Sequence, residues 1–323
     1  MSEPVVLARV VRSGVEESVH LGHVAVCDAD GRLVAHAGDA GRVVFARSSL
    51  KPLQAAVSVE AWGGSLDHDG IAVMCASHNG EPVHVDAVRS VLSRADLDEK
   101  ALRCPPAWPW WHRDAVGLDR PRPVLHNCSG KHAGMLLASA GNGWDIEGYL
   151  DPAHPLQERI RAAVARMAGL SSLRMGIDGC GAPVYALPLS SMATLFARLV
   201  SAHGPLGDGA HLAVDAMRRK PYLVAGRDRV DTTVMQVADG LVVKSGAEGL
   251  ICAVHVERGI GVAVRIDDGA ARGAGPALVR TLELLEVVGT GEIEKLESIA
   301  RPPILGGERP VGAVTSDFTL MPG

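Results

Sequence analysis

The sequence predicts an α+β protein, and three observations support this class. Segments in which apolar and polar residues alternate occur toward both ends of the 323-residue chain. The middle of the chain instead carries segments of mostly helical character, separated by loops rich in Pro and Gly. Tight-turn dipeptides join the alternating segments. We therefore expect an antiparallel sheet built from both chain ends and packed on helices, with a helical region inserted in the middle.

The first expected element is an amino-terminal hairpin. Residues 19–27 alternate in the manner of a strand, and residues 32–36 resemble a returning strand. The turn between them, at residues 28–31, ends in Gly31, which suits a tight reversal of the chain.

The last third of the chain repeats this pattern. Asp239-Gly240 is a favoured hairpin dipeptide, and it lies between two short apolar segments. The strands expected here are residues 233–238, 241–245, 251–257 and 260–266. Residues 271–288 then carry apolar side chains at helical spacing. With the first hairpin, this predicts about five antiparallel strands and a helix after them.

The middle of the chain is expected to be mainly helical. The helices expected there are residues 49–62, 82–94, 131–140, 155–168, 192–203 and 209–219. We expect one unit over residues 1–323, with its sheet-containing part at about 1–60 and 222–323. Its mainly helical part is expected at about 61–221.

Composition excludes several classes of protein. The formal net charge is −5 and Lys and Arg form no long runs, which argues against a nucleic-acid-binding surface. No stretch approaches the roughly 18–20 apolar residues of a membrane helix, and the first residues do not resemble a signal peptide. Six cysteines are spread widely and form no CxxC pair, so we expect reduced thiols rather than a disulfide framework. These features predict a cytoplasmic protein.

The strongest local motif contains Ser48 and Lys51. Their i, i+3 spacing at the start of an expected helix places both side chains on one face. A serine hydroxyl becomes a nucleophile when a neighbouring base removes its proton, and a lysine with a lowered pKa can be that base. The alternative is a serine N-cap followed by a surface lysine. The pattern alone leaves both interpretations open.

Two further motifs place polar groups in turns. Residues 75–81 follow an apolar run and precede a helix, in what we expect to be a strand-to-helix turn where Ser77 could activate water or orient a substrate. The alternative is a capping turn. Lys244 ends an expected strand beside Ser245 and Gly246, an arrangement that can direct a lysine into a cleft. The alternative is an exposed lysine in a β-turn.

A possible metal site combines two separate segments. Residues 126–132 bring together Cys128, Lys131 and two histidines, and Cys180 lies in a Gly-rich loop after an apolar segment. Cys is a usual zinc ligand, whereas lysine is a rare one because it must lose its proton first. The alternative is a pair of buried thiols.

A charged cluster precedes the expected strand at residue 233. Arg229 and Asp231 could bind the carboxylate and the amino group of a substrate. The alternative is a solvated loop.

Taken together, these motifs resemble the L-asparaginase II family, in particular the group that is similar to the inducible thermolabile Rhizobium enzymes. The resemblance covers about residues 5–318. The matching motifs, in chain order, are residues 45–52, 75–78, 126–132, 176–181 and 244–249. The resemblance implies a fold similar to serine β-lactamases and glutaminases, and hydrolysis of L-asparagine to L-aspartate and ammonia. Asn79, where serine is usual, departs from the pattern.

The resemblance also implies roles for individual residues. It implies two Ser–Lys pairs, Ser48 with Lys51 and Ser77 with Lys244. Zn²⁺ would be held by Cys128, Lys131 and Cys180. Arg47 and Asp178 fall at motif positions that line the site, and His78 belongs to one of the motifs; with Arg229 and Asp231, these form the expected substrate-binding set. A homodimer is the family expectation.

Several other functions fit part of the sequence. A glutaminase would use the same site. A penicillin-recognising hydrolase shares the SxxK and KSG motifs, but has no use for the Cys128/Cys180 pair. A non-catalytic amide-binding or metal-binding protein would bind ligand without releasing ammonia.

Overall fold

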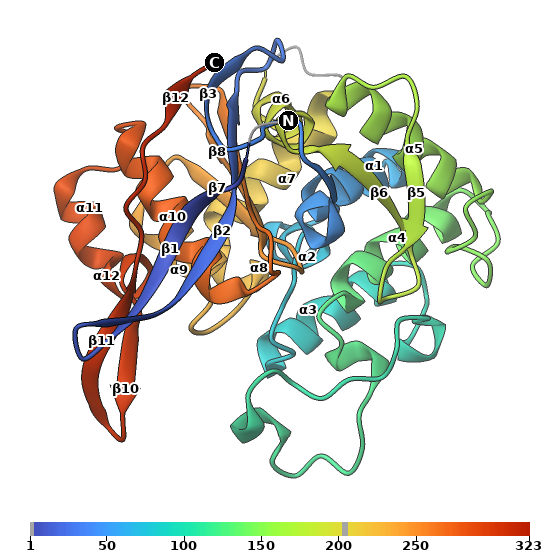
Figure 1. The fold of residues 1–323 in the computed structure, drawn as a ribbon. Helices are drawn as coiled ribbons and strands as arrows, with labels where there is room; N and C mark the ends of the chain where they lie inside the picture. Colours follow the sequence, from blue (N-terminus) through green and yellow to red (C-terminus); the bar gives the residue numbers. More distant parts are fainter. Residues whose placement is uncertain (1–2, 202–205) are drawn as a thin grey trace. The chain divides into compact units, whose positions relative to one another are not determined.

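A computed structural model describes residues 3–201 and 206–323 of the chain, and these residues divide into two units made of interleaved segments (Figure 1). The first unit combines residues 3–49, 187–201 and 233–323. The second combines residues 50–186 and 206–232. The chain therefore passes from one unit to the other several times.

The first unit contains an antiparallel sheet in which both ends of the chain take part. Its strands are β1 (Val5–Arg12), β2 (Val15–Cys27), β3 (Leu33–Ala37), β7 (Leu241–Ser245), β8 (Leu250–His255), β9 (Ile260–Ile266), β10 (Pro303–Gly306), β11 (Arg309–Thr315) and β12 (Met321–Pro322). The strand order is β10-β11-β1-β2-β9-β8-β7, with β3 paired to β2 and β12 paired to β3. A further short strand, β4 (Val43–Phe45), precedes the Ser48 motif.

The long strand β2 organises this sheet because it changes partner along its length. Its first part pairs with β1, from Arg12 opposite Val15 onward, and its last part pairs with β3, where Val24 faces Ala37. Residues 22–27 of β2 pair on the other side with β9. The alternation at residues 19–27 therefore corresponds to a strand with neighbours on both edges.

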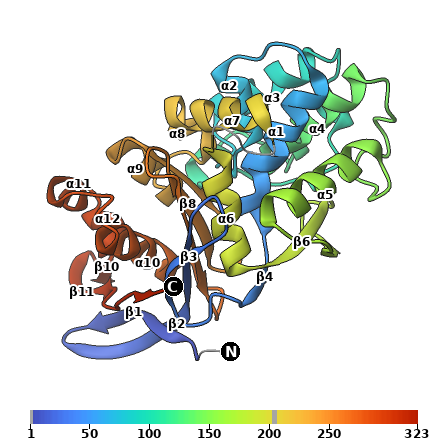
Figure 2. The ribbon, with the colours of Figure 1, turned by 90° about the horizontal axis from the view of Figure 1, so that it is seen from above.

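Helices cover both faces of the sheet, so its central strands are buried on both sides. Helix α6 (Leu189–Leu199) packs against β9, β2 and β8, and α10 (Ala271–Leu284) packs against β1, β9 and β8 (Figure 2). Gly261 permits the close contact with α6, because a Cβ at this position would lie 2.0 Å from the carbonyl oxygen of Ala193. Two short helices, α11 (Thr290–Lys295) and α12 (Glu297–Ala300), lead to β10.

The second unit is mainly helical. Its helices are α1 (Lys51–Trp62), α2 (His68–Met74), α3 (Pro82–Ser93), α4 (Ser129–Gly141), α5 (Pro155–Ala168), α7 (Gly207–Arg219) and α8 (Pro221–Val224), and β5 (Arg174–Ile177) pairs with β6 (Pro183–Pro188). Helix α1 packs against α7, α4, α5 and α2. At the crossing of α4 and α2, a Cβ on Gly130 would lie 2.0 Å from the carbonyl oxygen of Val73, so only glycine allows this approach.

The α+β class and the sheet built from both chain ends are confirmed, and most expected helices are present. The helix expected at residues 192–203 begins at Leu189 and ends at Leu199, and residues 202–203 lie outside the described residues. Within the described part of the chain, no helix is long and apolar enough to span a membrane.

Three expectations about individual elements are wrong. Residues 233–238 are not a strand: residues 233–237 belong to helix α9 (Val230–Val237), whose buried residues Asp231, Val234 and Met235 follow helical spacing. The apolar run at residues 71–74 is the end of α2, so residues 75–81 connect two helices. The sheet contains nine strands among the described residues rather than about five.

Candidate active site

The Ser48 motif forms a tight turn that leads into α1. Residues Arg47–Leu50 form one 3-10 turn, and Pro52 occupies the first turn of α1, where its missing N–H has no cost. Arg47 adopts a φ of 46°, a left-handed conformation that is rare for a residue with a side chain. Strained backbone of this kind is frequent beside functional groups, because it directs the next side chain. Ser48 itself is half-buried.

In the first unit, Lys244 is attached to this turn through the neighbouring serine. The buried Ser49 hydroxyl donates to the backbone oxygen of Lys244 over 3.1 Å. Gly246 makes room for the contact, since a Cβ there would lie 2.9 Å from Ser49 Oγ. The Lys244 side chain is fully buried, and its Nζ donates to the backbone oxygen of Ser245 over 2.8 Å. The structure thus brings the end of β7 to the Ser48 turn.

In the second unit, Lys51 is fully buried and bound at three points. Its Nζ donates to the Ala76 oxygen at 2.6 Å, to Ser77 Oγ at 3.0 Å and to the Asn127 oxygen at 3.1 Å. Burial lowers the pKa of Lys51 below its ordinary value, although the neighbouring Cys128 sulfur opposes this. A lysine with a lowered pKa can accept a proton from a serine, which is what the predicted role requires.

The predicted metal ligands also converge in the second unit. Lys131 Nζ donates to Cys180 Sγ over 2.9 Å, and the Cys180 thiol is hydrogen-bonded to Cys128. This bond and the nearby lysine charges lower the pKa of Cys128 well below its ordinary value, whereas the same bond raises the pKa of Cys180. Asp178 lies beside the cluster, with its Oδ2 at 4.0 Å from Cys180 Sγ.

This donor set fits a metal that prefers sulfur. The Lys131 amino group contacts Cys180, Cys180 is hydrogen-bonded to Cys128, and Zn²⁺ binds thiolate and nitrogen donors. Within the described residues, no group of three His, Cys, Asp or Glu side chains could hold a metal, so the third protein ligand here would have to be Lys131. Burial opposes the charge of Lys131, but the sulfurs of Cys180 and Cys128 hold its pKa above the ordinary value. Metal binding would therefore have to release protons from the site.

His78 follows Ser77 and is buried, and both of its ring nitrogens are hydrogen-bonded to protein groups. Its Nδ1 accepts from the Gly80 N–H at 3.1 Å, so its Nε2 carries the proton and donates to Ser129 Oγ at 2.9 Å. Ser129 in turn donates to the Val124 oxygen. Burial lowers the pKa of His78 well below its usual range, which keeps the ring neutral. Its role in binding substrate stays a prediction, and in the structure it joins residues 77–80 to the segment that carries Cys128.

Arg229 is held beside the Ser77 segment, and Asp231 is buried in α9. Arg229 donates to Asn79 Oδ1 over 2.9 Å, and its guanidinium lies 4.7 Å from the centre of the Trp110 ring. Asp231 is 1% exposed and lies in the first turn of α9.

Further buried polar residues near this site were not predicted from the sequence. Asn79 and Glu81, which belong to the 75–81 motif, are both buried and bound to Arg227. The density of charged residues at 227–233 was the feature of the sequence that could have indicated buried partners such as Asn79 and Glu81. No pattern in the sequence points to the backbone oxygens that hold Lys51.

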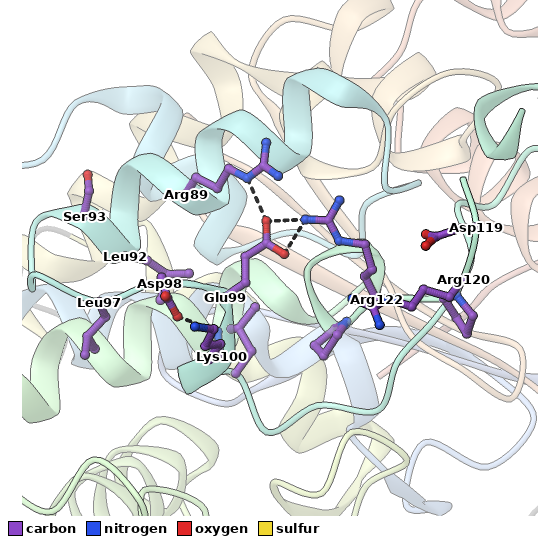
Figure 3. A pocket seen from close by; sticks show the side chains of 13 residues that line it. Arg89, Leu92, Ser93, Leu97, Asp98, Glu99, Lys100, Asp119, Arg120 and Arg122 are labelled. Atoms are coloured by element: carbon purple, nitrogen blue, oxygen red, sulfur yellow. Dashed lines mark hydrogen bonds and ion pairs between the residues drawn. The ribbon is translucent and has the colours of Figure 1, made fainter. Parts of the chain in front are cut away.

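A cavity of about 930 Å³ lies elsewhere in the second unit (Figure 3). No predicted site residue lines it. On one wall, Glu99 accepts from Arg89 at 2.7 Å and from Arg122 at 2.5 Å, so one carboxylate joins α3 to residue 122. Arg122 also forms a backbone bridge with Ala107. This ion cluster therefore closes the base of the loop between residues 107 and 122, and Trp110 belongs to that loop.

Comparison with known proteins identifies the class. The family profile described as L-asparaginase II matches residues 8–316, which is nearly the whole chain. The fold and the family match place the protein among the amidohydrolases. The chain belongs to the L-asparaginase II family. No curated protein sequence matches the chain significantly.

The solved structures that resemble this chain share little sequence with it. A β-lactamase from Mycobacterium bovis is 15% identical, with a TM-score of 0.45, over 82% of this chain and 94% of that one. A Bacillus glutaminase is 13% identical, with a TM-score of 0.48, over 82% and 91% of the two chains. Mglu in its glutamate form is 14% identical, with a TM-score of 0.49, over 82% of this chain and 61% of that one. At these levels, the activities of those proteins do not transfer to this one.

Proposed function

We propose that the protein is an L-asparaginase that hydrolyses L-asparagine to L-aspartate and ammonia, with Ser48 as its nucleophile. The observation that carries the proposal is the fully buried Lys51 Nζ, 3.0 Å from Ser77 Oγ and one helical turn after Ser48. A buried amine with a lowered pKa that contacts a serine hydroxyl is suited to proton transfer, and we assign Lys51 as the base for Ser48, three residues before it in the chain. Membership of the L-asparaginase II family supports the substrate.

The proposed reaction is acyl transfer in two steps. Lys51 takes the proton of Ser48, and Ser48 Oγ attacks the side-chain amide carbon of asparagine. The C–N bond breaks, ammonia leaves with a proton returned by the lysine, and an ester to Ser48 remains. Water then attacks this ester and releases aspartate. Ser77 and Lys244 form the second proposed pair, which moves protons during both steps.

Backbone groups and charged side chains supply the remaining functions. N–H groups at the start of α1 stabilise the oxyanion that forms in each step. Arg229 binds the α-carboxylate of the substrate, and Asp231 binds its amino group. Arg47 and Asp178 complete the lining. A glutaminase would use the same groups, so only a comparison of substrates separates the two activities.

The same proposal includes a zinc ion held by Cys128, Lys131 and Cys180. When bound, Zn²⁺ would add a positive charge that helps to orient the substrate. Ser48 already provides the nucleophile, so the protein does not need the metal for that purpose. The contact between Lys131 and Cys180 supports this choice of ligands.

Metal analysis tests the zinc site independently of activity. We expect about one Zn²⁺ per chain in the purified protein, and loss of at least tenfold in affinity when Cys180 or Cys128 is replaced by serine. Metal content by mass spectrometry and competition with a chromophoric chelator would measure both. Cys27→Ala removes a buried thiol of the first unit and should leave the zinc content unchanged. Full zinc occupancy in the Cys128→Ser/Cys180→Ser double variant would show that the metal binds elsewhere.

Ammonia release tests the activity. Purified protein supplied with Zn²⁺ is expected to release ammonia from L-asparagine faster than from L-glutamine, and to leave nitrocefin intact. Faster turnover of glutamine would make the protein a glutaminase. Turnover of nitrocefin would favour a penicillin-recognising hydrolase, and tight amide binding without ammonia would favour a binding protein.

A further inference from the structure

Asn79 is a buried residue whose hydrogen-bonding groups are all in use. It is 1% exposed. Its backbone N–H donates to the Ala225 oxygen at 2.9 Å, and its backbone oxygen accepts from the Trp110 N–H at 2.7 Å. Its side-chain amide donates to Glu81 Oε1 at 2.9 Å and to the Arg227 oxygen at 3.0 Å. The amide oxygen is left to accept from Arg229.

These partners fix the orientation of the amide. Glu81 Oε1 and the Arg227 oxygen can only accept, and Arg229 can only donate. Rotating the amide by 180° would place its oxygen against two acceptors and its NH₂ against a guanidinium. The oxygen of Asn79 therefore has to point at Arg229.

Glu81 makes this orientation stable because it remains charged. Tyr222 donates to its Oε2 at 2.5 Å, and the Arg227 N–H and guanidinium donate to its two oxygens at 3.0 and 3.2 Å. Burial opposes the charge, but these hydrogen bonds and that of Asn79 hold the pKa of Glu81 below its ordinary value. Arg227 is also paired with Asp114 at 3.1 Å, which ties the loop that carries Trp110 to the same cluster.

The planar guanidinium of Arg229 is thereby restrained along one edge and on one face. Asn79 holds one edge of its guanidinium, and the Trp110 ring covers one face at 4.7 Å. The same short segment carries Ser77, whose N–H donates to the Val224 oxygen at 2.9 Å, just as that of Asn79 donates to the next oxygen along. The segment of residues 77–79 therefore fixes the position of Ser77 and, through Asn79, that of the Arg229 guanidinium.

We propose that Asn79 is a positioning residue for substrate selection, which fixes Arg229 to receive the α-carboxylate of the substrate. The inference rests on the proposed amidohydrolase function. An amide oxygen orients the guanidinium without adding a negative charge. A carboxylate in its place would neutralise Arg229 and would face Glu81 at close range, so a neutral acceptor is the side chain that keeps the arginine ready for an anion.

The test compares two ligands that differ in one group. L-Asparagine carries the α-carboxylate, whereas 3-aminopropanamide is the same molecule without it. In a Ser48→Ala background, which separates binding from turnover, Asn79→Ala and Asn79→Asp are each expected to raise the Kd for L-asparagine about 10-fold or more, with aspartate the stronger effect. The Kd for 3-aminopropanamide should stay within about twofold. Calorimetry measures both ligands on each variant.

Controls separate positioning from folding. Trp110→Ala changes an exposed side chain and should raise the Kd for L-asparagine in the same selective manner, even if the buried Asn79 variants fail to fold. Arg229→Gln should reproduce the effect, and Asn79→Ala added to it should change the Kd no further. Asn142→Ala removes another amide that binds backbone oxygens, at the end of α4, and should change neither Kd.

The outcomes are distinct. Equal weakening of both ligands in the Asn79 and Trp110 variants, or no weakening of either, would overturn the positioning role. Selective weakening of L-asparagine binding in a protein whose parent form releases no ammonia would support the positioning role and refute the proposed reaction. Failure of the Ser48→Ala protein to bind L-asparagine at all would refute both.

Discussion

Replacement of Ser48 by alanine is expected to reduce asparagine hydrolysis by roughly 10³-fold or more, because the ester of the proposed reaction forms on the Ser48 hydroxyl. KM should change little, since the hydroxyl is small and the groups that bind the substrate remain. Steady-state ammonia release at saturating asparagine would measure the loss. Circular dichroism should show an unchanged fold, because Ser48 is half-buried and lies in a turn.

Labelling identifies which serine is acylated. A diazoketone analogue of asparagine should add one group to the wild-type chain, on the peptide that contains Ser48. Ser58→Ala is the matched control, because Ser58 lies in α1 and its hydroxyl only donates to the Gln54 oxygen. That variant should keep full activity. Labelling of Ser77 in the wild-type protein would reverse the roles of the two predicted pairs.

Replacement of Lys51 by methionine is expected to reduce kcat by about 10²–10⁴-fold, the range for loss of a general base. Methionine fills much of the same space but cannot take a proton. Methionine also has no N–H to donate to the Ala76 and Asn127 oxygens. We therefore expect a loss of roughly 1–3 kcal/mol in the free energy of unfolding. Stopped-flow measurement of the first turnover and urea denaturation would measure the two effects separately.

Two controls accompany this variant. Lys295→Met changes an exposed lysine of α11 and should leave both activity and stability unchanged. Lys51→Arg keeps the charge but remains protonated at neutral pH, so it should be nearly as inactive as Lys51→Met. An active Lys51→Arg protein would mean that Lys51 acts through its charge, and the base would have to be sought at Lys244.

Local patterns predicted most of the helices and two of the three expected hairpins, because each is defined by neighbours along the chain. The strands β1, β10 and β11 were not predicted, since their pairing joins Arg9 to Thr315 across the whole sequence. Residues 233–238 were predicted as a strand because their Val and Thr residues favour strands, whereas the burial of Asp231, Val234 and Met235 follows helical spacing. Tertiary contacts overrode local preference there.

The candidate site shows the same limit. The motifs were sufficient to select Lys51, Ser77, Lys131 and Cys180, which the structure brings together within the second unit. Their roles stay predictions, as do the homodimer and the cytoplasmic location. The contact of Asn79 with Arg229 joins residues 150 positions apart, and no spacing rule could have indicated it.

The sheet of the first unit has a consequence for the order in which the chain can fold. During synthesis, β1, β2 and β3 emerge first, but their partners β9, β11 and β12 come from residues 260–322. The segments of the second unit are complete once residue 232 has been made. The amino-terminal strands must therefore wait with open edges while the helical unit is assembled. Released chains that are truncated near residue 240 should have a protease-resistant helical part and a protease-sensitive amino terminus.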